Sequence, residues 1–496
     1  MPIVTKKPSL LLSLVPVAVL VGLIVLNIMI YKDESTNGAN QLALLLAALV
    51  SAAIGVFILK VSYSEMEERI LHSISLSMQA NILLLVVGSL IGLWIFSGVV
   101  PAMIYYGIKL ISPAWFLPIC CIVCTVVSLA TGSSWSTGGT VGIALIGIGQ
   151  ALGLPIEMVA GAVISGSYFG DKISPLSDTT ILAPAMAGTD LFTHIRYMLY
   201  TTVPSIIIAL IGFVILGFFY KADTTNLAQI DTVLQMMDSQ FNITPWLFIL
   251  PLLVFYMISR KVDALPALVI GCMVGASFVV IFQYDLLLKL LGGNVTAKGV
   301  YKLLIDAAVG GYKSETGNKV IDSLLTRGGM TSMLSTVWLI LMAMVFGGVM
   351  EATGMLEAIA RSILKLVRGV GGLITATISS CILTNLTAAD QYLAIVIPGK
   401  MFKQAFDEAG LAPQNLSRCL DDAGTVTSVL VPWNTCGAFF ATVLGVSTGA
   451  YLPFCFFNLI NPITAIVVGN LGWKIKMQNP ETSLPEGRKM PAPEMA

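Results

Sequence analysis

Long apolar runs separated by short polar segments dominate the chain. The regular runs cover about 9–30, 41–60, 82–105, 113–130, 197–219, 245–258, 265–282, 333–350 and 451–472. A helix needs about 20 mostly apolar residues to cross a bilayer. Lipid cannot pair free backbone N–H and C=O groups, so such segments cross as helices. The pattern therefore predicts an all-α polytopic membrane protein with about 10–12 transmembrane helices.

The composition agrees with this class. Hydrophobic residues make up 56% of the 496-residue chain and charged residues only 11%, whereas a soluble domain carries roughly 25% charged residues. The formal net charge is zero, so the chain lacks the basic surface that nucleic acid requires. We therefore expect membrane lipid, and no nucleic acid, around this protein.

Three polar segments interrupt the apolar pattern. We expect the charged segment 62–77 to lie on the surface, 288–330 to form a polar loop, and the tail 477–496 to be disordered. Lysine and arginine gather in alternate short loops, while the first loop holds Lys32 alone. The positive-inside rule then places both termini in the cytoplasm.

Two apolar regions, 131–190 and 381–437, are broken repeatedly by polar residues and proline. The first contains TGSSWSTGGT at 131–140 and YFGDKISPLSDTT at 168–180; the second contains TNLTAADQ at 384–391 and DDAGTVTSVLVPWNT at 421–435. Two ordinary polar loops are the alternative, but the apolar residues between the breaks argue against them. Paired breaks in the two halves are typical of inverted-repeat transporters. We predict two inverted repeats, each with a re-entrant hairpin and a broken helix.

This pattern divides the chain into five parts. We expect scaffold helices at 1–110, a first repeat core at 111–220, further scaffold helices with the polar loop at 221–350, a second repeat core at 351–476, and a cytoplasmic tail at 477–496. The substrate site of such a transporter lies near the middle of the membrane, between the repeats.

Asp178 is the leading ion-site candidate in the first half. It stands between Ser177 and Thr179, and Pro175 three residues earlier removes a backbone donor and frees carbonyl groups. A carboxylate with hydroxyl and carbonyl oxygens is a ligand set for Na⁺. Asp171 precedes it by two helical turns; it either faces the same cavity or pairs with its neighbour Lys172.

Asp390 is the matching candidate in the second half. Asn434 follows a proline by two residues, and we expect it to take the place that Asp178 has in the first half. A carboxylate inside the membrane is costly, so its default interpretation is functional. Asp421 and Asp422 are either functional or interfacial. The further polar candidates are Asn385, Thr387 and Thr435.

These segments resemble the NhaC-type Na⁺/H⁺ antiporter family of the ion transporter superfamily. The likeness is carried by TGSSWSTGGTVG, GSYFGDKISPLSDTT, TNLTAADQY and VPWNT. The resemblance implies secondary transport driven by Na⁺ or proton gradients, an inner-membrane location and an elevator-type homodimer. Because that family also includes exchangers of the malate/lactate type and amino-acid carriers, it supports cation coupling more strongly than any one cargo.

Two transport functions remain open at this point. In a Na⁺/H⁺ antiporter, Asp178 and Asp390 bind Na⁺ or protons alternately. In an organic-acid or amino-acid exchanger, a small organic anion also binds exposed N–H groups at a helix start. The candidate residues for such an anion-binding site are Thr131, Ser133, Ser134 and Thr137.

A membrane enzyme is the rival of a different class. No HExxH or GxxxxGK[ST] motif occurs, and a GxGD pattern fails because residue 168 is tyrosine. Only two histidines are present, and Cys121 and Cys124 stand in an apolar run without a second pair. We expect no enzyme activity and no cofactor beyond the transported Na⁺. The paired breaks also favour a transporter over a passive channel.

Overall fold

The computed structural model describes residues 7–31, 35, 38–110, 112–220, 233–260, 262–314, 322, 325–364 and 369–478. All regular elements among these residues are helices, as predicted. Eight helices are long and apolar enough to cross a membrane, or up to eleven if each of three bent pairs counts as one span. The described chain is therefore an all-helical polytopic membrane protein.

The first half contains ten α-helices and two π-helical segments. Their bounds are α1 Leu10–Tyr31, α2 Ala39–Ile54, η2 Gly55–Leu59, α3 Tyr63–Phe96, α4 Val99–Leu110, α5 Pro113–Thr131, α6 Ser134–Thr137, η3 Gly138–Gly142, α7 Ile143–Ala151, α8 Ile156–Ile173, α9 Asp178–Ala187 and α10 Leu191–Phe219.

The second half continues the same kind of structure. Its elements are η4 Pro245–Phe248, α12 Ile249–Ser259, α13 Ala264–Phe282, α14 Tyr284–Leu290, α15 Ala297–Gly310, η5 Met330–Met333, α17 Leu334–Ala352, α18 Met355–Leu364, α19 Gly369–Thr387, α20 Gln391–Glu408, α21 Pro413–Leu420, η6 Asp421–Thr425, η7 Ser428–Leu430, α22 Thr435–Leu444, α23 Thr448–Tyr451, η8 Leu452–Phe454 and α24 Phe456–Asn470.

Two polar segments contain helix, and the first of them, 62–77, is largely exposed, as expected. The charged segment 62–77 is the start of α3, a single 34-residue helix, because the Ser62 hydroxyl caps its first turn by accepting from the Glu65 N–H. At 1.5 Å per residue such a helix is about 51 Å long, so its charged end can extend beyond a bilayer. The expected loop 288–330 contains α15, which Thr296 caps in the same way. Residues 479–496 of the expected tail lie outside the described residues.

The scaffold helices of the two halves pack in matching but opposite ways. Helix α1 packs on α2 as α12 packs on α13, and α2 contacts α17 as α13 contacts α3. Helices α3 and α17 run antiparallel, since Gly348 near the end of α17 lies beside Ile70 at the start of α3, and Gly88 lies beside Met333. This arrangement agrees with the predicted inverted repeat.

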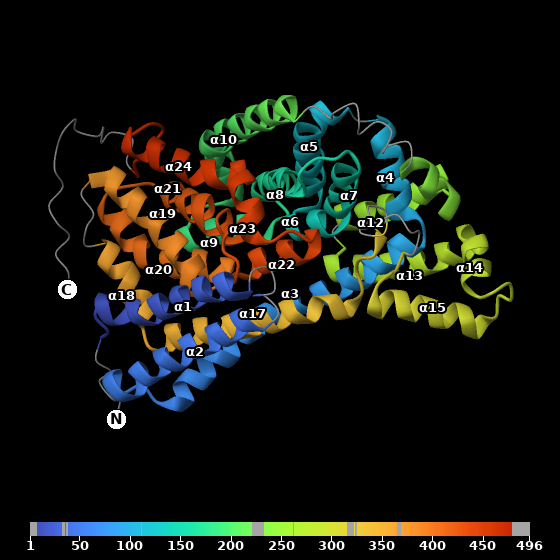
Figure 1. Ribbon diagram of the computed structural model, residues 1–496. Coiled ribbons are helices and arrows are strands. Elements are labelled where there is room, and N and C mark those ends of the chain that lie inside the picture. The colour runs from blue at the N-terminus through green and yellow to red at the C-terminus, as the bar shows by residue number, and fades with distance from the viewer. Residues whose placement is uncertain are drawn as a thin grey trace.

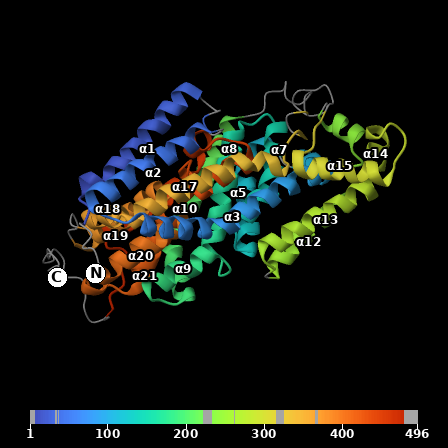
Figure 2. The same cartoon turned by 90° about the horizontal axis from the view of Figure 1, so that it is seen from below.

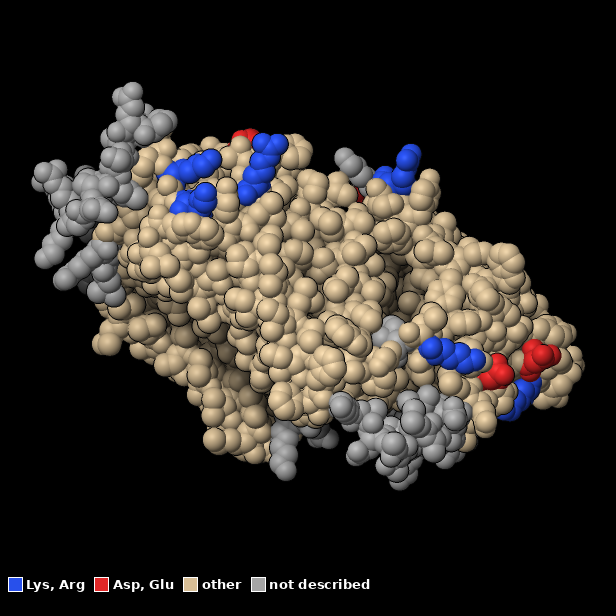
Figure 3. Space-filling model, turned by 90° about the horizontal axis from the view of Figure 1, so that it is seen from above, with Lys and Arg blue, Asp and Glu red and all other residues tan. Residues whose placement is uncertain are grey.

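The molecule has two layers (Figure 1). Helices α1, α2, α3, α13, α15 and α17 form one long layer, seen from below in Figure 2, and α5–α10 with α19–α24 form the other. In the second layer α5 packs closely on α8. Gly166 permits this close packing, because a side chain at that position would collide with the Cys121 carbonyl. Lys, Arg, Asp and Glu are sparse on the face shown in Figure 3. The second layer holds both broken regions.

Candidate functional site

The first break of each repeat has the same backbone form. In the first half Gly132 has a φ of +67°, and Ser133 then caps α6. In the second half Ala389 has a φ of +57°, and Asp390 then caps α20. Each break thus consists of a residue with positive φ followed by a helix cap, so the two breaks are structural counterparts. A positive φ is strained for alanine, and such strain concentrates at functional positions.

The second breaks also match, but with a one-residue correction to the expected register. Ser177 caps α9 two residues after Pro175, and Asn434 caps α22 two residues after a proline. Asn434 is thus the counterpart of Ser177, and Thr435 is the counterpart of Asp178. The expected pairing of Asn434 with Asp178 was wrong, because sequence alone does not locate the first helical residue.

Each repeat has a candidate coupling carboxylate at one helix start. In the first repeat it is Asp178, at the first position of α9, and its counterpart is Thr435. In the second it is Asp390, and the Thr435 hydroxyl donates to its Oδ2 at 3.5 Å. The Thr435 N–H donates to the Ala389 carbonyl at 2.9 Å, which holds the two breaks together.

Asp171 is buried against the start of α6. Its Oδ2 accepts from the Ser134 N–H at 3.1 Å and from the Ser134 hydroxyl at 2.7 Å. The alternative in which Asp171 pairs with Lys172 is not found among the described residues, where the ion pairs of Lys172 are to Asp421 and Asp422. Neighbouring residues on a helix point in different directions, so these two side chains enter different sites.

Two asparagines connect the breaks of the second half. Asn385 Nδ2 donates to the Gly424 carbonyl at 2.8 Å, and Asn434 Nδ2 donates to Asn385 Oδ1 at 3.0 Å. Asn434 Oδ1 also accepts from the Cys436 N–H at 3.1 Å. This chain of bonds fixes the start of α22 against the end of α19.

The remaining predicted hydroxyl groups bond locally. Thr131, Thr137 and Thr387 each donate to a carbonyl of the nearby backbone, and Ser177 and Thr179 bond to each other at 3.1 Å. The hydroxyls of the three threonines therefore stabilise the helix ends.

Asp178 differs from the other two carboxylates in its surroundings. Its side chain is exposed and makes no hydrogen bond or ion pair with any described residue. Helix α9 nevertheless packs on α20, the helix that Asp390 caps. The structure thus places Asp178 and Asp390 at the starts of two helices that pack on each other, with Asp178 exposed.

The two repeats also meet through aromatic contacts. Trp135 beside the first break stacks on Phe439 of α22, with ring centroids 4.1 Å apart. The hydroxyls of Tyr168 and Ser428 lie 3.3 Å apart. The broken segments of the two halves are therefore in direct contact.

A second group of charges was not predicted as a site. Lys172, His194, Arg418, Asp421 and Asp422 meet at the junction of α8, α10, α21 and η6, and none of their side chains has exposed surface. The available sequence signal was the pair of adjacent aspartates with two basic residues inside otherwise apolar broken regions. We call these five residues the charge cluster.

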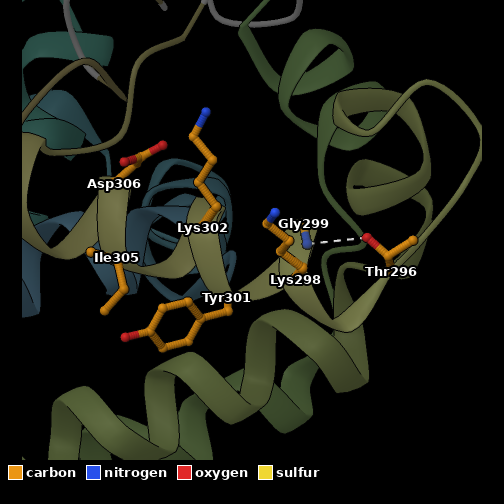
Figure 4. Close-up of a pocket in the computed structure, with 7 residues that line it drawn as sticks. All are labelled: Thr296, Lys298, Gly299, Tyr301, Lys302, Ile305 and Asp306. Carbon is orange, nitrogen blue, oxygen red and sulfur yellow. Dashed lines mark hydrogen bonds between the residues drawn. The ribbon is translucent and has the colours of Figure 1, made fainter.

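One hollow lies on the molecular surface, away from the breaks. It runs along α15, has a volume of about 500 Å³ and is open to the outside (Figure 4). Its lining residues are Thr296, Lys298, Gly299, Tyr301, Lys302, Ile305 and Asp306. Neither the breaks nor the charge cluster contributes to it.

Comparison with known proteins places the chain in a family. The sequence pattern of the Na⁺/H⁺ antiporter family matches residues 4–183 and 166–473. The chain is 37% identical to the Na⁺/H⁺ antiporter NhaC of Alkalihalophilus pseudofirmus, covering 94% of this chain and 96% of that one. It is 36% identical to the malate-2H⁺/Na⁺-lactate antiporter of Bacillus subtilis (87% and 89% covered) and 33% identical to the arginine/ornithine antiporter ArcD of Halobacterium salinarum (96% and 95%). The chain therefore belongs to the Na⁺/H⁺ antiporter family of secondary transporters.

Proposed function

We propose that this transporter exchanges Na⁺ for protons at the breaks, with Asp178 and Asp390 as the coupling carboxylates. One observation supports this most strongly: α9, which begins at Asp178, packs on α20, which Asp390 caps, and Asp178 makes no hydrogen bond or ion pair with any described residue. An unpartnered carboxylate beside hydroxyl and carbonyl oxygens suits a hard cation. Asp171 supports the start of α6, and Asn385 supports the start of α22 through Asn434.

Competition at one carboxylate is sufficient for exchange. A bound Na⁺ stabilises the ionised form, whereas a bound proton removes the charge that attracts Na⁺. The site then holds either ion but not both. Protonation releases Na⁺ on one side of the membrane, and Na⁺ displaces the proton on the other.

The helix starts at the breaks argue against an anionic cargo there. Side chains of the protein already accept hydrogen bonds from the backbone N–H groups at these helix starts. Asp171 accepts from Ser134, and Asp390 accepts from Tyr392 and Leu393. Asn434 accepts from Cys436 in the first turn of α22. A carboxylate substrate would have to displace these caps. Protons and Na⁺ need no such rearrangement.

The relatives nevertheless justify testing a second cargo. The names of two of them describe malate/lactate and arginine/ornithine exchange. Purified protein in liposomes with an internal pH-sensitive dye separates the alternatives. We expect Na⁺ added to acid-loaded vesicles to raise the internal pH without any organic solute, and choline to have no effect. A pH change that requires malate, lactate or arginine would favour the exchanger.

The orientation and assembly follow as further proposals. The positive-inside pattern supports a cytoplasmic location for both termini, which requires an even number of crossings. Impermeant thiol labelling of single cysteines introduced near each end should therefore fail in intact cells; labelling of either end would contradict this topology. The family resemblance also implies a homodimer, which mass measurement of the purified protein in lipid nanodiscs would test.

A further inference from the structure

A small hollow lies beside the first break, on the side that faces the scaffold helix α12. One of its walls is the hairpin that α5 forms with α6 and η3, the other wall is α12, and its volume is about 30 Å³. A cavity of roughly 10–15 Å³ is sufficient for one water-sized ligand. The hollow therefore has room for a single small ion or a water molecule.

The polar wall of this hollow consists of three hydroxyl groups. They belong to Thr131, the last residue of α5, to Ser136 in α6 and to Thr140 in η3. We call the hollow with these three residues the hydroxyl pocket. Element η3 is a π-helical turn, and such turns are frequent at functional sites.

Two of the three hydroxyls direct their protons at backbone carbonyls. Thr140 donates to the Ser136 carbonyl at 2.7 Å. Thr131 donates to the Ser128 and Ser133 carbonyls at 3.4 and 3.5 Å. A hydroxyl has one proton and two acceptor lone pairs. Only the lone pairs of these two oxygens are left for a ligand, so both oxygens act as acceptors in the pocket.

Ser136 provides the observation that points to a ligand. Its side chain is 1% exposed, and its Oγ makes no hydrogen bond with any described residue. Buried hydroxyls are normally bonded to a partner. The pocket is also separate from the Asp171 site. Asp171 binds Ser134, and residues two apart on a helix point to nearly opposite sides.

The end of α5 adds a partial negative charge to the pocket. Helix α5 ends at Thr131, and Gly132 after it has a left-handed backbone. The last carbonyl groups of a helix lack helical partners and form the negative end of its dipole. Half-helix ends of this kind coordinate Na⁺ in transporters that are built from broken helices.

The opposite wall of the pocket is apolar. Pro251, Val254 and Ile258 of α12 line it, and their spacing of three and four residues places them on one face of the helix. These side chains offer no oxygen to a ligand, but they exclude water from it. A ligand in the pocket is thus held by the hairpin and covered by the scaffold.

We propose that the hydroxyl pocket binds one Na⁺, with Thr131, Ser136 and Thr140 as oxygen ligands and α12 as the cover. Hydroxyl oxygens at the carbonyl end of a helix suit a hard cation without a carboxylate. None of the lining residues has a titratable side chain, so this Na⁺ binds without releasing a proton.

The position of the pocket links Na⁺ to the packing of the two layers. The pocket is closed only while the hairpin lies against α12, so Na⁺ bound there stabilises this contact. The proposal rests on the proposed transport of Na⁺, and it adds to the exchanged ion a second Na⁺ that acid does not displace.

Equilibrium binding of radioactive Na⁺ to the purified protein tests the pocket. Ser136→Ala together with Thr140→Val removes two of its oxygens and leaves its shape nearly unchanged. We expect this double variant to bind about one Na⁺ fewer per molecule at alkaline pH, because the cation loses its oxygen ligands. The Na⁺ that it still binds should be displaced by acid. Thr140→Ser keeps the hydroxyl and should bind Na⁺ normally.

Two control variants remove hydroxyls elsewhere. Ser277→Ala on α13 and Thr377→Val on α19 each delete a hydroxyl that donates to the carbonyl four residues earlier, as that of Thr140 does. Both should bind Na⁺ normally. Ser136→Ala alone guards against misfolding, because the oxygen that it removes bonds to no described residue. It should weaken the binding of the Na⁺ that acid does not displace.

Asp178→Asn separates the pocket from the breaks. This variant should lose the Na⁺ that acid displaces and keep the Na⁺ of the pocket. Undiminished binding by the folded double variant would mean that the pocket holds only water, which would overturn this site and leave the proposed exchange intact. Loss of all Na⁺ binding in Asp178→Asn would also overturn the pocket.

The remaining outcomes decide between the two proposals. Loss of one Na⁺ in the double variant, with normal binding by Asp178→Asn, would support the pocket and contradict the breaks. No Na⁺ binding by the unmodified protein would overturn both.

Discussion

Replacing Asp178 by asparagine is expected to abolish Na⁺-driven proton movement while leaving the protein folded. The side chain is exposed and makes no bond to the described residues, so its amide form costs little in packing. The asparagine side chain does not take up and release a proton as a carboxylate does, and it lacks the negative charge that attracts Na⁺. In dye-loaded liposomes the Na⁺-dependent pH change should fall to the level of protein-free vesicles.

Asp407→Asn provides the control for this experiment. Asp407 is also exposed, on α20, and it accepts one bond from Gln478, so the same chemical change away from the breaks should leave exchange near normal.

We expect Asp390→Asn to be as damaging as Asp178→Asn, since asparagine still caps a helix well but removes the second carboxylate. Normal exchange by Asp178→Asn would mean that another carboxylate couples the two ions.

The apparent affinity for Na⁺ is expected to weaken as the pH falls. Protons and Na⁺ compete for the same ionised carboxylate, so acid pH leaves fewer sites available to Na⁺. Where the free site is mostly protonated, competition by one proton raises the apparent Kd about tenfold for each pH unit. Above that range the affinity should become independent of pH. Na⁺ titrations of the dye response at a series of pH values measure this slope. A pH-independent Na⁺ affinity in the unmodified protein would contradict competition at any site.

The sequence was sufficient for the architecture because hydropathy determines which segments enter the membrane. The runs near 9–30, 113–130 and 265–282 coincide closely with α1, α5 and α13. The broken regions were equally visible, since Gly132, Pro175 and Pro432 interrupt apolar stretches at positions where the helices end or begin. The charged residues at 65–69 made segment 62–77 look separate from the apolar run that follows it. The two form one helix, α3, since a helix can extend beyond the lipid.

Parts of the site could not be derived from the sequence. Ser177 and Asn434 could be recognised as counterparts only from the positions of the caps of α9 and α22. An error of one residue in the position of a cap changes which side chain faces the partner repeat. Proximity along the chain suggested Lys172 as one possible partner of Asp171, although a helix directs adjacent residues to different sides. The partners of Lys172 are in the other half of the chain, and folding alone brings them together.

Equilibrium binding of radioactive Na⁺ to the purified protein tests the central claim most directly. Scintillation-proximity counts are compared at alkaline and acid pH, with unlabelled Na⁺ and K⁺ as competitors, for the unmodified protein and for Asp178→Asn and Asp407→Asn. We predict saturable Na⁺ binding at alkaline pH that acid partly displaces, that Asp407→Asn retains, and that Asp178→Asn reduces. Equal binding at both pH values, or undiminished binding by Asp178→Asn, would contradict a site at the breaks that holds either Na⁺ or a proton.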